Sequence, residues 1–311
     1  MHNREILIDY LNYKVKFIVY QAKEERYEIM EDITIAVGET IRKIQKMKNI
    51  KIRNIYEGHF SESTYYRIIN GEIETSIVTF NHILNQLHVT YDEFFHICKQ
   101  HNYGRNIDYL SKIEWASLKQ SRFELTDISQ NLSEENISTE IIHLQHLCDL
   151  LIKKIDKVNI RVDDNPLIEY LINLDEWTRY ELKLFNSCMF VFDLEFVNLL
   201  SCNLYKKYKN NSLYKEYEVE IFRLLINTVV INTQNFYFEK ARKVFCLARR
   251  IDLPEDSLFE RNLALFWSGF FEIRDGYSAG ETKIKNSLAV FQLLKSETFY
   301  IMYKRIYMVI R

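Results

Sequence analysis

Apolar residues recur every three or four positions along most of the chain, the spacing that places them on one face of a helix. The stretch 35–101 contains five short segments of this kind. The third follows Ser61, whose side chain can cap a helix, and stops at Asn70-Gly71, a favourable helix end. The pattern therefore predicts five short helices between residues 35 and 101.

The same periodicity continues from residue 105 to the end of the chain, in longer segments separated by points rich in Asn, Asp and Ser. We predict helices over ten ranges: 105–121, 138–158, 166–173, 176–187, 189–208, 214–233, 236–250, 256–274, 277–295 and 297–310. The polar stretch 126–139 predicts a linker or an exposed loop.

A weak repeat lies within this second part of the chain. The run Phe238-Glu239-Lys240-Ala241 returns as Tyr277-Ser278-Ala279-Gly280, with an aromatic residue three positions before a small one in both. We expect the aromatic side chain to pack on the preceding helix and the small residue to let two helices approach closely. Such a pattern is typical of tetratricopeptide-like stacking of helix pairs.

The composition favours an all-α protein with two folded domains. Only 7 glycines and 2 prolines occur in 311 residues, too few for the many tight turns of a sheet protein. We predict an N-terminal extension at 1–34, a five-helix domain at 35–101 and a helical-repeat domain at 105–311. Translation that begins at Met30 and a genuine helical extension both agree with the leader 1–30.

The net charge of −2 excludes a molecule that is basic over its whole surface, so contact with nucleic acid requires a local cluster. One stretch, residues 40–56, contains six basic residues and no acid: Arg42, Lys43, Lys46, Lys48, Lys51 and Arg53. Such a cluster can neutralise several phosphates. It is also compatible with a helix face that merely contacts water.

The third predicted helix has a polar side next to this cluster. Tyr65 and Ile68 share its apolar face, which leaves five residues for contact with DNA: Ser61, Ser63, Thr64, Tyr66 and Arg67. Serine and threonine hydroxyls bond phosphates or bases, and arginine reaches a phosphate or a guanine edge. We therefore predict a helix-turn-helix that binds double-stranded DNA.

Other signals narrow the class of protein. The five cysteines have no paired spacing, and the chain shows neither a secretory signal nor 18 consecutive apolar residues, so we expect a cytoplasmic protein without a membrane partner. His143 and His146 lie one helical turn apart, but no second cluster completes a metal site. Phosphate-binding loops and catalytic motifs are also missing from the sequence, so we expect neither a cofactor nor enzyme activity.

The segment Gly38–Phe95 resembles the λ-repressor-type helix-turn-helix of the Rgg/GadR/MutR family of Gram-positive regulators. Further segments resemble this family in the expected order: Glu176–Asn186 with its W-x-x-Y-E pattern, Leu225–Asn227, Phe236–Ala241, Trp267–Gly269 and Tyr300–Tyr307. The resemblance covers residues 35–311.

This resemblance implies a homodimeric transcriptional regulator whose helical repeats bind a short signalling peptide in their concave face. It implies amide contacts from Asn227 and Asn262 and apolar pockets lined by Trp177, Tyr180 and Phe190, with ordinary core packing or a solvated helix surface as the alternative for each. Phe190 departs from the family, because some peptide-responsive members carry an arginine there. Two other hypotheses stay open: a regulator that needs no ligand, and a helical-repeat interaction module that has lost DNA binding.

Overall fold

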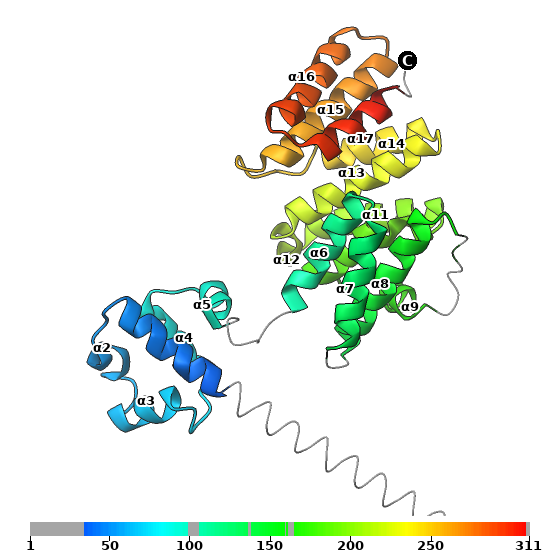
Figure 1. Ribbon diagram of the computed structural model, residues 1–311. Coiled ribbons are helices and arrows are strands. Elements are labelled where there is room, and N and C mark those ends of the chain that lie inside the picture. The colour runs from blue at the N-terminus through cyan, green and yellow to red at the C-terminus, as the bar shows by residue number, and fades with distance from the viewer. Residues whose placement is uncertain (1–33, 99–105, 136–137, 159, 161–164, 309–311) are drawn as a thin grey trace, which may run out of the picture. The chain divides into compact units, whose positions relative to one another are not determined.

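The computed structural model describes residues 34–98, 106–135, 138–158, 160 and 165–308 (Figure 1). The two interpretations of residues 1–30 concern residues outside these ranges. The described residues form helices and no strand, which confirms the predicted all-α class. The chain divides into two compact units, Met1–Ile107 and Asp108–Arg311, called here the N-terminal and C-terminal units.

The described residues 34–98 of the N-terminal unit form five helices: residues 34–47, α2 (Ile52–Tyr56), α3 (Glu62–Ile69), α4 (Ile77–Leu87) and α5 (Tyr91–Cys98). Their apolar faces meet in one core that includes Ile44, Tyr65 and Phe94. At Gly38 the helix 34–47 passes so close to α3 that a Cβ atom would lie 2.6 Å from the Ile68 carbonyl oxygen. Because glycine has no side chain, the two helices can cross this closely at Gly38.

The C-terminal unit is a series of helices joined by short links: α6 (Asn106–Leu118), α7 (Arg122–Ser133), α8 (Thr139–Ile155), α9 (Pro166–Ile172), α10 (Arg179–Cys188), the 3-10 helix η2 (Met189–Val191), α11 (Leu194–Asn210), α12 (Ser212–Lys215), α13 (Glu218–Gln234), α14 (Phe238–Ala248), α15 (Leu258–Arg274), α16 (Ala279–Leu293) and α17 (Glu297–Met308). Neighbouring helices pack as pairs, notably α7 with α8, α13 with α14 and α15 with α16. None of the helices described here has both the length and the apolar character that crossing a membrane requires.

The loop predicted at 126–139 is wrong, because α7 occupies most of it. Ser121 caps this helix by accepting a hydrogen bond from the Glu124 N–H, at 3.2 Å. Three apolar residues spaced as one helical stripe, Leu125, Ile128 and Leu132, are buried against the core. The polar residues between them form the exposed side of an amphipathic helix.

The short repeat has the predicted role at Gly280, but the role predicted for its aromatic residues is wrong. A Cβ atom at Gly280 would lie 2.4 Å from the carbonyl oxygen of Gly269, so these glycines let α15 and α16 touch through their backbones. Phe238 packs near Phe270 of α15, the helix that follows, and not on the preceding helix α13; the two ring centroids are 6.5 Å apart. Tyr277, the second aromatic residue, is instead 64% exposed.

Candidate functional site

Helix α3 has a buried side and an exposed side. Ser61 starts the helix, and its Oγ accepts a hydrogen bond from the Thr64 N–H, at 3.1 Å. Tyr65 and Ile68 are buried in the core. The five residues predicted to contact DNA are exposed or half-buried: Ser61, Ser63, Thr64, Tyr66 and Arg67. A short capped helix thus presents hydroxyl groups and one guanidinium to solvent.

The basic residues predicted to flank α3 lie on the helix 34–47 and around the start of α2: Arg42, Lys43, Lys46, Lys51 and Arg53. All are exposed except Arg42, which is half-buried. Arg53 pairs with Glu57, at 2.6 Å, and Arg67 pairs with Glu72, at 3.9 Å, with all four side chains more than half exposed. Exposed pairs of this kind contribute little stability, so an incoming phosphate can displace them.

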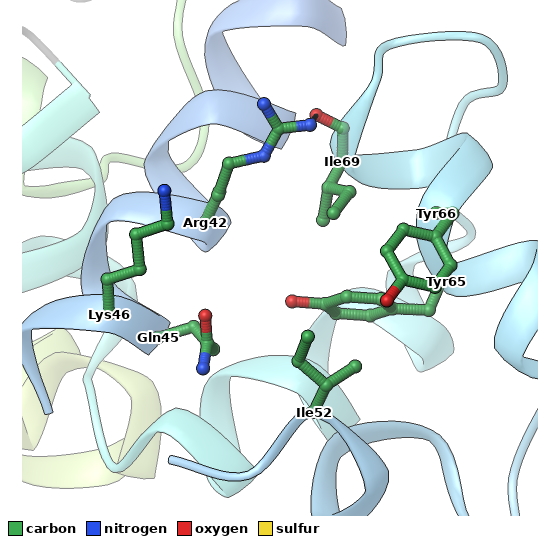
Figure 2. A pocket seen from close by; sticks show the side chains of 7 residues that line it. All are labelled: Arg42, Gln45, Lys46, Ile52, Tyr65, Tyr66 and Ile69. Carbon is green, nitrogen blue, oxygen red and sulfur yellow. Dashed lines mark hydrogen bonds between the residues drawn. The ribbon is translucent and has the colours of Figure 1, made fainter. Parts of the chain in front are cut away.

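A hollow of about 270 Å³ lies between the helix 34–47, the start of α2 and α3 (Figure 2). Its lining residues are Arg42, Gln45, Lys46, Ile52, Tyr65, Tyr66 and Ile69. The hydroxyl of Tyr65 is buried and has no hydrogen-bond partner among the described residues. Burial raises the pKa of this hydroxyl to about 12, so it stays protonated at neutral pH.

Sequence reasoning missed Gln45 and Tyr65 as possible contact residues. Helical spacing correctly assigns the Tyr65 ring to the core, but it carries no information on where the hydroxyl points. The hollow lies between helices that cross closely where Gly38 meets Ile68, and these two residues are 30 positions apart in sequence.

A row of polar side chains crosses four helices of the C-terminal unit. We call it the polar row, and its members are Glu114 of α6, Asn186 and Ser187 of α10, Arg223 and Asn227 of α13, and Glu260 of α15. The Ser187 hydroxyl donates to the Lys183 carbonyl oxygen of its own helix at 3.0 Å and more weakly to Glu114 Oε1 at 3.4 Å. Asn227 Nδ2 donates to Asn186 Oδ1 at 2.9 Å, and Arg223 Nε donates to Glu260 Oε1 at 2.7 Å. Hydrogen bonds therefore join α6 to α10, α10 to α13, and α13 to α15.

The charges in the polar row are unequally exposed. The Glu260 side chain is 4% exposed, whereas its partner Arg223 is 47% exposed. Burial raises the pKa of Glu114, although the positive charges of Lys183 and Arg223 and the Ser187 hydroxyl act in the opposite direction. These carboxylates sit in surroundings where hydrogen bonds to them are stronger than in water.

Phe190 and Lys154 form a further pair in the same unit. The Lys154 ammonium lies 4.0 Å from the centre of the Phe190 ring, which is a cation–π contact. Desolvation lowers the pKa of this lysine. A positive charge thus lies beside Phe190, the position where some peptide-responsive members of the family that the sequence resembles carry an arginine.

A second hollow, of about 350 Å³, is lined by Thr139, Glu140, His143, Tyr170 and Tyr180. His143 Nδ1 lies 3.3 Å from the Tyr180 hydroxyl, and the Tyr170 hydroxyl donates to Glu181, at 2.6 Å. Burial lowers the pKa of His143 and favours its neutral form. Tyr180 lies on the same helical stripe of α10 as Lys183 and Ser187, about two turns before Ser187 of the polar row.

Two of the five predicted peptide contacts lie in the core instead. Trp177 is 3% exposed, its backbone N–H donates to the Tyr214 hydroxyl at 2.9 Å, and its ring packs on Phe185. Asn262 is 7% exposed, and its Nδ2 donates to the Ser287 carbonyl oxygen at 3.2 Å, between α15 and α16. Both side chains are therefore packed in the core. The other three, Tyr180, Phe190 and Asn227, are half-buried: Tyr180 lines the second hollow, Asn227 belongs to the polar row, and Phe190 contacts Lys154.

Residues 123–305, more than half of the chain, match the family model of the C-terminal domain of the HTH-type transcriptional regulator Rgg. The chain belongs to the Rgg family of helix-turn-helix transcriptional regulators. This identifies the C-terminal unit as an Rgg C-terminal domain and confirms the resemblance stated from the sequence.

Solved structures of low sequence identity share the fold of this Rgg-family protein. The SHP pheromone receptor Rgg2 of Streptococcus dysgalactiae is 19% identical, with a TM-score of 0.67 over 87% of this chain and 98% of that chain. A protein of Listeria monocytogenes EGD-e assigned as a transcriptional regulator is 20% identical, with a TM-score of 0.74 over 89% and 97%. PrgX in its cCF10 complex is 13% identical, with a TM-score of 0.66 over 89% and 92%.

Proposed function

We propose that this Rgg-family protein regulates transcription by binding promoter DNA through α3 and the basic residues beside it. The observation that carries the proposal is the exposed polar side of α3, which adjoins cations on the helix 34–47 and α2 and belongs to the same chain as an Rgg C-terminal domain. Arg67, Ser63 and Tyr66 are the base-contacting candidates, and Lys43, Lys46, Lys51 and Arg53 neutralise phosphates. The protein then acts in the cytoplasm, where bacterial DNA lies.

Fluorescence anisotropy with the DNA that flanks its own gene tests this proposal. We expect the full-length protein to bind this duplex more tightly than a scrambled one, with an affinity that falls steeply as salt rises. Arg67→Ala is expected to weaken specific binding, by about 1–3 kcal/mol if the arginine pairs with a guanine. Arg250→Ala, an exposed arginine of the C-terminal unit, is the matched control.

Loss of promoter regulation in cells by Arg67→Ala and Lys46→Ala, but not by Arg250→Ala, would agree with these contacts. If neither substitution in the N-terminal unit alters promoter output, the chain is an interaction module that has lost DNA binding. A homodimer is part of the proposal, because two α3 helices then reach half-sites about one turn of DNA apart. Sedimentation of the free protein measures that state.

We further propose that the polar row and the second hollow bind a short signalling peptide. Rgg2 is described as a pheromone receptor, and PrgX has been solved in complex with cCF10, which is what suggests the ligand class. An extended peptide exposes N–H and C=O groups along its backbone. Paired amides such as Asn186 and Asn227, with carboxylates and a guanidinium beside them, provide both acceptors and donors for those groups.

Synthetic peptides encoded by short reading frames beside the gene test the ligand. We expect one of them to bind the full-length protein in calorimetry and to change its affinity for the flanking DNA. Asn227→Ala is expected to weaken peptide binding about five- to tenfold, the effect of one lost hydrogen bond. Asn203→Ala, at an exposed asparagine of α11, is the control. DNA affinity and promoter output that no peptide changes would leave a regulator that needs no ligand.

A further inference from the structure

The hollow in the N-terminal unit contains a hydroxyl that the fold itself does not use. The Tyr65 oxygen is buried, has no hydrogen-bond partner among the described residues and points into the space beside Arg42, Gln45 and Lys46 (Figure 2). A buried polar group without a partner costs free energy. Phenylalanine would fill the same core position without that cost. The partner of this hydroxyl is therefore to be sought in a ligand of the hollow.

The lining of the hollow defines the chemistry of that ligand. No carboxylate lines it, and two cationic side chains do, Arg42 and Lys46. Arg42 donates through Nη2 to Asn70 Oδ1 at 2.6 Å and to the Ile69 carbonyl oxygen at 3.4 Å, which leaves its Nε and Nη1 for another acceptor. The amide Nε2 of Gln45 donates to the Ile50 carbonyl oxygen. The groups left for a ligand are therefore three donors, the Tyr65 hydroxyl and the Arg42 and Lys46 cations, and one acceptor, the Gln45 Oε1. An anion with several oxygens satisfies the three donors.

The position of the hollow indicates where the anion comes from. Tyr66, an exposed residue of α3, and Ile52, the first residue of α2, both lie on its rim. In a helix-turn-helix the recognition helix, here α3, enters the major groove while the preceding helix, here α2, crosses the sugar-phosphate backbone, so a hollow between the two lies next to that backbone. We infer that the hollow binds one phosphate of the DNA backbone, with the Tyr65 hydroxyl, Arg42 and Lys46 as donors. This inference rests on the proposed DNA-binding function.

Tyr65→Phe tests the inference because it removes one oxygen and keeps the ring. Contacts to phosphate do not depend on base sequence, so a random-sequence duplex of about 30 base pairs at about 50 mM salt is a sufficient probe. We expect the full-length variant to bind about tenfold more weakly, the effect of losing one hydrogen bond to a charged acceptor. We expect its thermal stability to be unchanged or higher. Tyr91→Phe, in the exposed part of α5, is the control.

The salt dependence separates the neutral donor from the charged one. Tyr65→Phe removes no charge, so the slope of log affinity against log salt is expected to stay the same. Lys46→Gln is expected to reduce that slope by about 1, because one fewer counterion is released. A purely structural effect of Tyr65→Phe would lower stability and DNA affinity together.

A charge reversal provides a second, independent variant. Gln45→Glu places a carboxylate in the hollow and is expected to weaken DNA binding more than tenfold by repulsion. Gln86→Glu makes the same charge change on α4, away from the hollow, and is expected to have a smaller effect.

The outcomes distinguish failure of the inference from failure of the proposed function. A wild-type protein that binds no duplex even at low salt refutes the function. The phosphate site is refuted, and DNA binding stands, under the following result. Lys46→Gln weakens binding, but Tyr65→Phe binds as tightly as the wild type and Gln45→Glu binds as tightly as Gln86→Glu. The inference also fails if inorganic phosphate, at constant ionic strength, stabilises the wild type but not Tyr65→Phe while both bind DNA equally. The hollow would then be a site for free phosphate.

Discussion

Replacing Gly280 by alanine tests how closely α15 and α16 must approach in the C-terminal unit. The added methyl group would lie 2.4 Å from the Gly269 carbonyl oxygen and 2.9 Å from both Glu272 Cβ and Ile273 N. Non-bonded carbon atoms are in favourable contact only at about 3.5 Å or more, so the two helices have to move apart by about 1 Å. All three contacts are with backbone atoms or with the first atom of a side chain, so no rotamer change relieves them.

The net cost follows from two opposing effects. Overpacking of this kind costs about 3 kcal/mol, and the better helix propensity of alanine returns about 1 kcal/mol. A loss of about 2 kcal/mol corresponds to a fall in Tm of roughly 4–8 °C for a unit of this size. Calorimetry or circular dichroism of the full-length variant measures it, with the exposed Thr282→Ala as a control on the same helix.

The pair of glycines makes the test more specific. A methyl group at Gly269 would lie 2.5 Å from the Gly280 carbonyl oxygen, so both substitutions push the same two helices apart. The double variant is therefore expected to lose less stability than the sum of the two single variants. A Gly280→Ala protein with the Tm of the wild type would refute the argument that these helices need backbone contact.

Three further predictions concern other features of the C-terminal unit. Phe236 has a φ of +63° and is 70% exposed, so Phe236→Gly is expected to relieve left-handed strain and raise the free energy of unfolding by about 1 kcal/mol; a lower urea midpoint would contradict this. Since burial lowers the pKa of His143 in the folded state, the unfolded chain takes up the proton first, and stability is expected to fall as the pH drops through about 6.5. His143→Gln should flatten this part of the curve of urea midpoint against pH, and an unchanged curve would exclude His143 as the cause. Arg223→Ala leaves the buried Glu260 carboxylate unpaired and is expected to lower the free energy of unfolding by about 2–3 kcal/mol. Glu260→Gln is expected to lower it less, because the half-exposed arginine then returns to water. A lower Tm for Glu260→Gln than for Arg223→Ala would contradict this.

The helices could be predicted from the sequence wherever the apolar stripe is broad. Periodicity alone predicts a loop where α7 lies, because its apolar stripe consists only of Leu125, Ile128 and Leu132 among polar residues. A helix start signal is nevertheless present in the sequence, Ser121 three positions before Glu124. Local capping chemistry therefore carries information that hydrophobic periodicity alone misses.

The functional surfaces could be predicted only in part, for a physical reason. The exposed side of α3 follows from helical geometry, because Tyr65 and Ile68 define the buried side. The family resemblance implied Trp177 and Asn262 as ligand contacts, but both are packed against neighbours that lie far away in sequence, Tyr214 and Ser287. Contacts of that range are not encoded in a local pattern.

The pairing within the polar row determines what a ligand has to do there. Asn186 already bonds to Asn227, Ser187 to Glu114, and Arg223 to Glu260. A peptide gains little by only replacing these bonds, because each exchange leaves the number of hydrogen bonds nearly unchanged. Its net effect lies in which helices remain joined, since each of these pairs links two different helices. A ligand that breaks one pair and bridges another favours one arrangement of α6, α10, α13 and α15 over others, and such differential binding is what a regulatory response requires.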